Sequence, residues 1–364
     1  MIYFDATKIR SAGHRSGLTR VSQLLRQHLG VAATEVTWTR GELIASSGKK
    51  TVSLTRDDWF LTSELFSEEE RPGFSEFLSS PARLHRLAAI YHDAIPLKHP
   101  HITWPKSVAR HPIYLKLLAR FDQVWAVSRA SRDELMGFWD WQGVEHRPRV
   151  ETLALGADFD GAPRAVCTPV TAAGTVAGQD KTPGAPRPQL LCLGIIEPRK
   201  NQSMLVETCD QLWRERLDFE LHLVGRVNPH FGPPIVARLK MLAREHKGRL
   251  VFHKAASDAT VANLYRSARA TVFPTIAEGC GLPLLESLWR SVPCVCSDLP
   301  VLRENADGGG CLTVAVNDFA AWKSAVRKIV TDDALHARLQ QEAGARPLPT
   351  WREAAETLRR GLTD

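Results

Sequence analysis

Short apolar runs alternate with amphipathic segments along almost the whole chain, and this alternation restricts the fold more than any other feature of the sequence. In the first half, each run has the length of a strand and precedes a segment with helical spacing; the runs are MIYFDA, RLAAIYHDA, QVWAVS and RVETLALG. The second half repeats the pattern with QLLCLGII, FELHLVG, RLVFHK, ATVFPT and VPCVCS. Strands alternating with helices form parallel sheets covered on both faces, so we expect an α/β fold of two doubly wound, Rossmann-like domains.

A segment rich in Pro, Gly, Ala and Thr separates the two halves. The chain has 364 residues, enough for two domains, and the stretch 159–189 lacks any sustained apolar period. We therefore expect an N-terminal domain over 1–160, a linker or insertion over 161–188, a C-terminal domain over 189–345 and a final helix over 346–364. Such domains bind ligands outside the carboxyl ends of their strands, so two of them facing each other would form a cleft.

Charge and cysteine content exclude several classes of protein. The formal net charge is +7, but no compact basic run is interleaved with aromatics, which argues against nucleic-acid binding and leaves open a weak attraction to anionic lipid headgroups. No apolar run reaches about 18 residues and charges occur early in MIYFDATKIR, so we expect a cytoplasmic protein. Several of the seven cysteines lie in apolar runs and none has paired zinc spacing, so we expect buried thiols and no metal.

The segment TVFPTIAEGCGLPLLESLWRSVPCVCSDLP has two glutamates, Glu278 and Glu286, on either side of a glycine turn. It predicts a buried strand, a turn containing Gly279 and Gly281, and a helix with Pro283 in its first turn. Glycines let a ligand approach the backbone, and the first N–H groups of a helix favour a phosphate. The carboxylates can accept hydrogen bonds from hydroxyls, although a glutamate near a helix start also gains from the helix dipole alone. A sugar nucleotide needs both kinds of group.

A second segment, LGIIEPRKNQSMLVETCDQLW, has two adjacent cations after an apolar strand. Arg199 and Lys200 precede a helix that should begin near Asn201. Positive charge at a helix start opposes the helix dipole, which is easier to understand if an anion lies nearby. The pair is placed to neutralise a departing diphosphate, as a divalent metal does in other transferases. A solvated surface pair is the alternative.

These two segments together resemble the GT-B, family 4 retaining glycosyltransferases, especially the bacterial mannosyltransferase-like members that use GDP-mannose in building cell-surface polysaccharide. In the first half, SGLTRV resembles the glycine loop of that family and YHDAIPLKHP its His-Asp loop; near the end, PTWREAAETLRRGL resembles the closing helix that returns to the first domain. The resemblance implies the GT-B fold, with an acceptor domain over 1–160 and a donor domain over 189–345. It also implies that no cofactor or metal is required, the donor substrate being a nucleotide-diphosphate sugar.

The resemblance implies a role for each matching position. Glu278 would hold hydroxyls of the donor sugar, and Glu286 the ribose hydroxyls of the nucleotide. Arg199 and Lys200 would bind the diphosphate and stabilise the departing nucleoside diphosphate. The remaining positions serve phosphate binding and the loops of the first domain: backbone N–H groups of Gly281 and Leu282 at the phosphate with Gly279 in the same turn, Gly17 where a loop closes over the donor, and His92 beside the reacting sugar and acceptor.

The predicted reaction is transfer of a hexose, mannose by resemblance, to a saccharide acceptor with retention at the anomeric carbon. The two glutamates have the character of binding groups rather than of a glycosidase pair, so the departing phosphate would itself help deprotonate the acceptor hydroxyl. A polyprenyl-diphosphate-linked acceptor would suit a basic protein that visits the inner face of a membrane. Other readings stay open for two residues: His92 could form only a structural hydrogen bond with Asp93, and Tyr265 should pack on a sheet.

Alternative functions remain open at this stage. A UDP-sugar-dependent glycosyltransferase, or a sugar-nucleotide epimerase of the same fold, would need the same kinds of group. A dinucleotide-dependent oxidoreductase is not favoured, because SAGHRSGLTR lacks the compact Gly-x-Gly-x-x-Gly pattern. A non-catalytic binder of anionic surfaces explains the net charge but not the two glutamates around the glycine turn.

Overall fold

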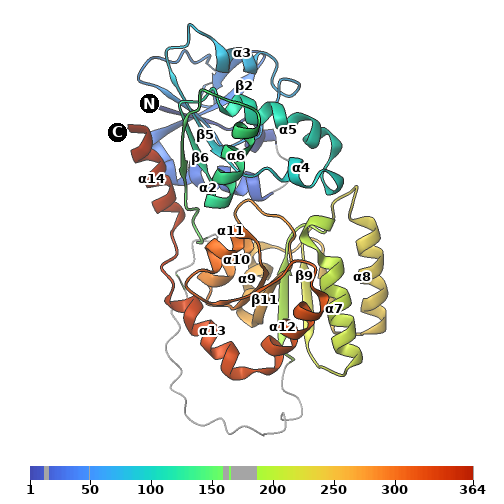
Figure 1. Cartoon of the computed structure of the whole chain (residues 1–364). Coiled ribbons are helices and arrows are strands. Elements are labelled where there is room, and N and C mark those ends of the chain that lie inside the picture. Colours follow the sequence, from blue (N-terminus) through green and yellow to red (C-terminus); the bar gives the residue numbers. More distant parts are fainter. Residues whose placement is uncertain (12–15, 49, 159–163, 165–186, 364) are drawn as a thin grey trace. The chain divides into compact units, whose positions relative to one another are not determined.

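The computed structural model describes residues 1–11, 16–48, 50–158, 164 and 187–363, which form two compact α/β units (Figure 1). Unit 1 comprises Met1–Gly156 and Pro349–Asp364, and unit 2 comprises Ala157–Leu348. The predicted linker over 161–188 lies outside the described residues, apart from Arg164 and positions 187 and 188. Within the described residues, every helix is too short or too polar to cross a membrane.

Unit 1 contains a sheet of seven described strands in the order β3-β2-β1-β4-β5-β6-β7. All neighbouring strands are parallel except β2 and β3, which form an antiparallel hairpin at one edge. The elements of this unit are β1 (Ile2–Asp5), α1 (Thr7–Ser11), α2 (Gly17–Leu29), β2 (Ala33–Thr39), β3 (Glu42–Ala45), β4 (Trp59–Thr62), α3 (Phe74–Ser79), β5 (Arg86–Tyr91), α4 (Ile95–Lys98), α5 (Pro105–Leu118), β6 (Gln123–Ala126), α6 (Arg129–Trp141), β7 (Arg149–Thr152) and α14 (Trp351–Thr363).

The hairpin at the edge departs from the all-parallel sheet that the sequence pattern predicts. Its turn is made by Arg40 and Gly41, which both have positive φ, 52° and 86°. Such turns are usually marked by Asn-Gly or Asp-Gly, because arginine rarely adopts this conformation. The hairpin therefore had only a weak sequence signal.

Helix α14 belongs to unit 1 although it ends the chain. It packs against α2 (Figure 1). Its buried residues include Trp351, Leu358 and Leu362. Gly361 lies so close to β6 that an added Cβ would be 2.9 Å from the ring of Trp125. Unit 1 is thus assembled from two segments that are far apart in the sequence.

Unit 2 contains a parallel sheet of six described strands in the order β10-β9-β8-β11-β12-β13. The chain adds β9 and β10 on one side of β8, then returns to place β11 on the other side. The elements are β8 (Gln189–Leu193), α7 (Gln202–Arg214), β9 (Glu220–Val224), α8 (Pro233–Glu245), β10 (Leu250–His253), α9 (Asp258–Ser267), β11 (Ala268–Phe273), α10 (Leu282–Trp289), β12 (Cys294–Ser297), α11 (Pro300–Ala306), β13 (Cys311–Val314), α12 (Phe319–Thr331) and α13 (Asp333–Ala345).

Alternating residues of β8 show how helices cover both faces of this sheet. Leu190 and Cys192 lie in a core cluster with residues of α7, α8 and α12, whereas Leu191 lies in a separate cluster with Tyr265 of α9. Successive residues of a strand point to opposite faces, so each cluster fills one face. The strand order reverses between β8 and β11, and in doubly wound sheets this is where ligands bind.

Candidate functional site

The loops after β8 and β11 start side by side, because these strands are neighbours in the sheet. Pro198–Lys200 form a short 3-10 helix after β8, and Asn201 then adopts a left-handed conformation before α7 begins. The Lys200 side chain is buried: its stem passes Gly194, and its ammonium lies 4.9 Å from the centre of the Phe273 ring. Lys200 is therefore not the solvated surface cation of the alternative reading.

Glu278, in the loop after β11, is held by three donors on one carboxylate oxygen. Lys200 Nζ lies 2.5 Å from Oε1, Arg199 Nη1 lies 3.1 Å from it, and the Thr275 hydroxyl donates to it at 2.6 Å. Among the described residues no donor reaches Oε2. The structure thus brings together three of the residues predicted for the site, and it fixes the orientation of the carboxylate so that one oxygen stays available.

Charge in this cluster is closely balanced. Burial alone would raise the pKa of Glu278, but Lys200 and Arg199 together outweigh it and hold the pKa of this carboxyl below its usual value. Burial lowers the pKa of Lys200, and Glu278 offsets only part of that effect. Glu278 is consequently ionised at neutral pH, and the cations beside it are already paired with carboxylates.

Glu197 and Asn228 also belong to this cluster, although the motifs did not single them out. Glu197 Oε1 accepts from Arg199 Nε at 3.0 Å and lies 2.8 Å from Arg199 Nη2, while Oε2 accepts from Asn228 Nδ2 at 3.0 Å. Asn228 is buried in the loop that follows β9. Their only sequence signal is a position just after a predicted strand, which many polar residues share.

The turn between β11 and α10 requires glycine at position 281. Gly279 is buried in this turn, and Gly281 caps the helix with a φ of 78°. An added Cβ at Gly281 would lie 2.5 Å from Leu302 Cδ2 and 3.3 Å from Asn305 Nδ2. Leu282 is the first residue of α10, so the helix begins where the sequence predicts a phosphate site.

Glu286 is buried inside α10 rather than exposed at the helix start. Its exposed fraction is 4%, and the hydroxyl of Tyr265 in α9 donates to its Oε2 at 2.9 Å. Tyr265 packs in the core as expected, and its ring lies 4.5 Å from the guanidinium carbon of Arg290. Tyr265 is therefore also a polar partner of a predicted site residue, a role that its helical spacing did not reveal.

The two predicted residues of unit 1 lie in different settings. Gly17 is exposed at the first position of α2, which Ser16 caps, whereas residues 12–15 of the predicted glycine loop lie outside the described residues. His92 is buried after β5, and its Nε2–H donates to the Ser63 carbonyl at 2.8 Å. Burial lowers the pKa of His92, so the ring is neutral. The Asp93 side chain instead accepts from the backbone N–H of Ile95, the first residue of α4, at 3.0 Å.

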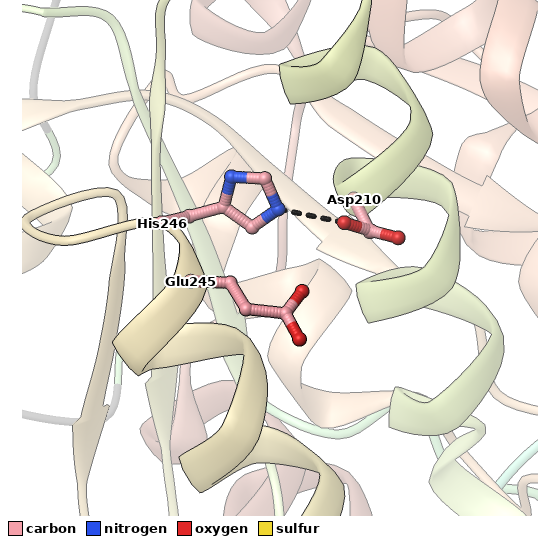
Figure 2. Close-up of side chains that lie close together, drawn as sticks. All are labelled: Asp210, Glu245 and His246. Atoms are coloured by element: carbon pink, nitrogen blue, oxygen red, sulfur yellow. Dashed lines mark hydrogen bonds and ion pairs between the residues drawn. The ribbon is translucent and has the colours of Figure 1, made fainter.

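One group in unit 2 has the composition of a metal site. Ligand atoms of Asp210, Glu245 and His246 all lie within 4.8 Å of one another, and Figure 2 shows His246 pointing at Asp210 with Glu245 beside them. Arg214 donates to Asp210 at 3.0 and 3.1 Å and to Glu245 at 3.1 Å. Asp210 and Arg214 lie in the later turns of α7, and Glu245 and His246 lie at the end of α8. In a parallel α/β sheet, these helix ends lie near the amino ends of the strands, away from the loops described above. The arginine supplies the positive charge that a metal would provide, so we assign the group a structural role.

Comparison with known proteins shows what the region that contains the cluster is similar to. Residues 179–346 match the family model described as glycosyl transferases group 1. The chain is 28% identical over 222 residues to the serotype-specific mannosyltransferase WbdA of Escherichia coli, a match that covers 60% of this chain and 26% of WbdA. It is also 28% identical over 261 residues to the O-antigen chain mannosyltransferase B of Escherichia coli, covering 70% of this chain and 64% of that protein. The chain thus spans about a quarter of the length of one curated relative and under two thirds of the other.

A solved structure matches both units. Sucrose-phosphate synthase from Thermosynechococcus elongatus aligns over 98% of this chain and 96% of its own, with a TM-score of 0.67 and 17% sequence identity. At that identity the match establishes the fold. Residues 179–346 thus match the glycosyl transferases group 1 model, and the chain as a whole has the GT-B fold.

Proposed function

We propose that this protein is a glycosyltransferase that moves a hexose from a nucleotide-diphosphate sugar to a saccharide acceptor in cell-surface polysaccharide or O-antigen synthesis. The family model and the two mannosyltransferase relatives support a sugar-transfer reaction, and both relatives are named for mannose. We therefore propose GDP-mannose as the donor.

The orientation of Glu278 is the observation that carries this proposal. Oε1 is occupied by Lys200, Arg199 and Thr275, and no described donor reaches Oε2. A carboxylate held in this way is preorganised to accept a hydrogen bond from a hydroxyl, which is what binding of a sugar requires. Glu278 then holds the donor sugar.

The neighbouring groups suit the rest of the donor. Arg199 and Lys200 bind the diphosphate and stabilise it as it departs, and the first turn of α10, with Gly279, Gly281 and Leu282, gives backbone N–H groups to the phosphates. Glu286 binds the ribose hydroxyls. For unit 1, the resemblance supports a role for Gly17 in donor binding and for neutral His92 in acceptor binding.

We propose that transfer occurs with retention and without a metal ion. Two fixed cations supply the charge stabilisation that a divalent ion gives elsewhere, and the departing phosphate removes the proton of the acceptor hydroxyl. NMR of the new glycosidic bond measures the anomeric configuration, and turnover after treatment with EDTA measures the metal requirement. An inverted product, or activity that returns only with an added divalent ion, would refute these two points.

A thermal-shift panel tests the donor. A nucleotide at about 100 times its dissociation constant adds about 2.7 kcal/mol to the free energy of unfolding. We expect GDP and GDP-mannose to raise Tm, and UDP, ADP and dTDP with their sugar conjugates to leave it unchanged; Glu286→Ala should abolish the shift. A shift with UDP-sugars alone would instead make this a UDP-sugar-dependent transferase, and release of an isomerised nucleotide sugar without acceptor would indicate an epimerase.

For the acceptor, we propose a polyprenyl-diphosphate-linked oligosaccharide at the inner membrane face. The net charge of +7 supports peripheral attraction of a cytoplasmic protein to anionic lipid. Sedimentation with vesicles of phosphatidylglycerol and phosphatidylcholine measures this attraction, which should weaken as salt rises. Equal recovery with purely zwitterionic vesicles would remove the membrane from the proposal.

A further inference from the structure

Glu197 connects two loops of unit 2 through its two carboxylate oxygens. Oε1 faces the Nε and Nη2 edge of the Arg199 guanidinium, and Oε2 accepts from the side chain of Asn228. The opposite edge of the guanidinium, Nη1, donates to Glu278 Oε1 and to the carbonyl of Ala277 at 2.9 Å. The plane of the guanidinium is thus fixed from two sides, and Glu197 fixes one of them.

The network determines the orientation of the Asn228 amide. Its Oδ1 accepts from the backbone N–H groups of His230 at 3.0 Å and Phe231 at 3.2 Å. Its Nδ2 must therefore face Glu197, which has to be an acceptor there. Glu197 also has to be an acceptor toward Arg199, because a guanidinium only donates. A carboxylate meets both demands, whereas a glutamine has only one acceptor oxygen.

We infer that Glu197 is a positioning residue: it orients the Arg199 guanidinium and ties it to the loop after β9, so that the groups around the diphosphate act as one preorganised unit. This inference rests on the role proposed above for Arg199. Glu197 has a side-chain exposure of 12%, so neither of its partners is readily replaced by water. Without it, Arg199 and Lys200 would share the single carboxylate of Glu278.

A swap of the two side chains tests the inference. Glu197→Gln turns an NH₂ group toward either Arg199 or Asn228, and misplacement of the guanidinium should lower kcat about 10–100-fold with a smaller effect on donor KM. Asn228→Asp sets two carboxylate oxygens against each other. In the double variant Glu197→Gln/Asn228→Asp, the glutamine oxygen faces Arg199 and the glutamine NH₂ faces the carboxylate introduced at position 228. Both the guanidinium and the glutamine NH₂ then have an acceptor. The total charge of the two side chains is the same as in wild type. The double variant should therefore regain kcat to within a few-fold of wild type.

The pH profile of Asn228→Asp adds a readout that a purely structural role would not change. Two facing carboxylates can share one proton, so the activity of this variant should rise as pH is lowered, while wild type should not show this rise. Glu245→Gln is the matched control: it removes a carboxylate from the same unit, away from the cluster, and should leave kcat unchanged.

The measurement is turnover with GDP-mannose and acceptor for the four proteins of the cycle, together with their urea-unfolding midpoints, which need no ligand. Rescue of both kcat and midpoint in the double variant supports the inference. If wild type turns over and Glu197→Gln matches it within two-fold, or the double variant is no better than the worse single variant, the inference is overturned. If wild type transfers no sugar while the double variant recovers the midpoint, the proposed function fails and the hydrogen-bonded pairing stands.

Discussion

Replacing Gly281 with alanine tests the backbone geometry on which the candidate donor site depends. The residue has a φ of 78°, and its added Cβ would lie 2.5 Å from Leu302 Cδ2 and 3.3 Å from Asn305 Nδ2. A left-handed conformation costs a residue with a Cβ about 1–2 kcal/mol, and forcing a methyl group into a packed site costs about 1–3 kcal/mol more. We expect a loss of about 2–5 kcal/mol, in the lower half of that range because Leu302 Cδ2 ends a flexible side chain.

Urea and thermal unfolding of the purified variant measure this loss. At about 2–4 °C per kcal/mol, a loss in that lower half should reduce the Tm of unit 2 by roughly 4–14 °C. The matched control is Gly17→Ala, because Gly17 is exposed in α2 and its added Cβ would have no atom within 4 Å. This control should be unchanged or up to about 1 kcal/mol more stable. If Gly281→Ala unfolds at the same Tm and urea midpoint as wild type, or if Gly17→Ala is markedly less stable than wild type, the reasoning is refuted.

Three further substitutions test buried polar groups. In unit 1, burial and, to a smaller extent, the charge of Asp5 raise the pKa of Glu64 to about 7. Because the pKa in the folded state lies above the ordinary value, the contribution of Glu64 to stability is full below about pH 4.5 and is lost as pH rises through 7. Glu64→Gln should therefore flatten this part of the curve of unfolding free energy against pH. Tyr265→Phe removes the donor to buried Glu286 and should cost about 1–3 kcal/mol in urea unfolding and weaken GDP binding in calorimetry; unchanged values for both would show that the hydroxyl is dispensable. Burial alone would raise the pKa of Asp210, but His246 and Arg214 hold the pKa of this carboxyl below its usual range. Asp210→Asn should therefore reduce the loss of stability on acidification below about pH 4. An unaltered acid-unfolding midpoint would contradict this expectation.

The sequence predicted most of the parallel framework but not the hairpin of unit 1. Apolar runs mark β8 to β12 clearly, because both faces of these strands are covered by helices. Strand β4, Trp59–Thr62, was not predicted, because the two aspartates that directly precede it interrupt the apolar pattern. The hairpin was missed because Arg40 occupies a turn position where asparagine or aspartate would be expected.

The cluster of Arg199, Lys200 and Glu278 follows from the fold class once the loops after two strands are known to be neighbours. The contacts that refine it do not follow. Asn228 reaches Glu197 because the pairing of β8 with β9 continues past the strands, where Ile196 pairs with Val227. Hydrogen bonds of this kind depend on register and rotamer, neither of which leaves a periodic trace in the sequence.

The division of unit 1 into two stretches of sequence has a consequence for biosynthesis. During translation, Met1–Gly156 leaves the ribosome before Ala157–Leu348, and the residues of α14 follow both. Unit 2 can therefore finish folding on the nascent chain while the half that was translated first still lacks the helix that packs on α2. A stop codon within 349–364 would therefore damage unit 1, most of which is translated earlier, and leave unit 2 whole.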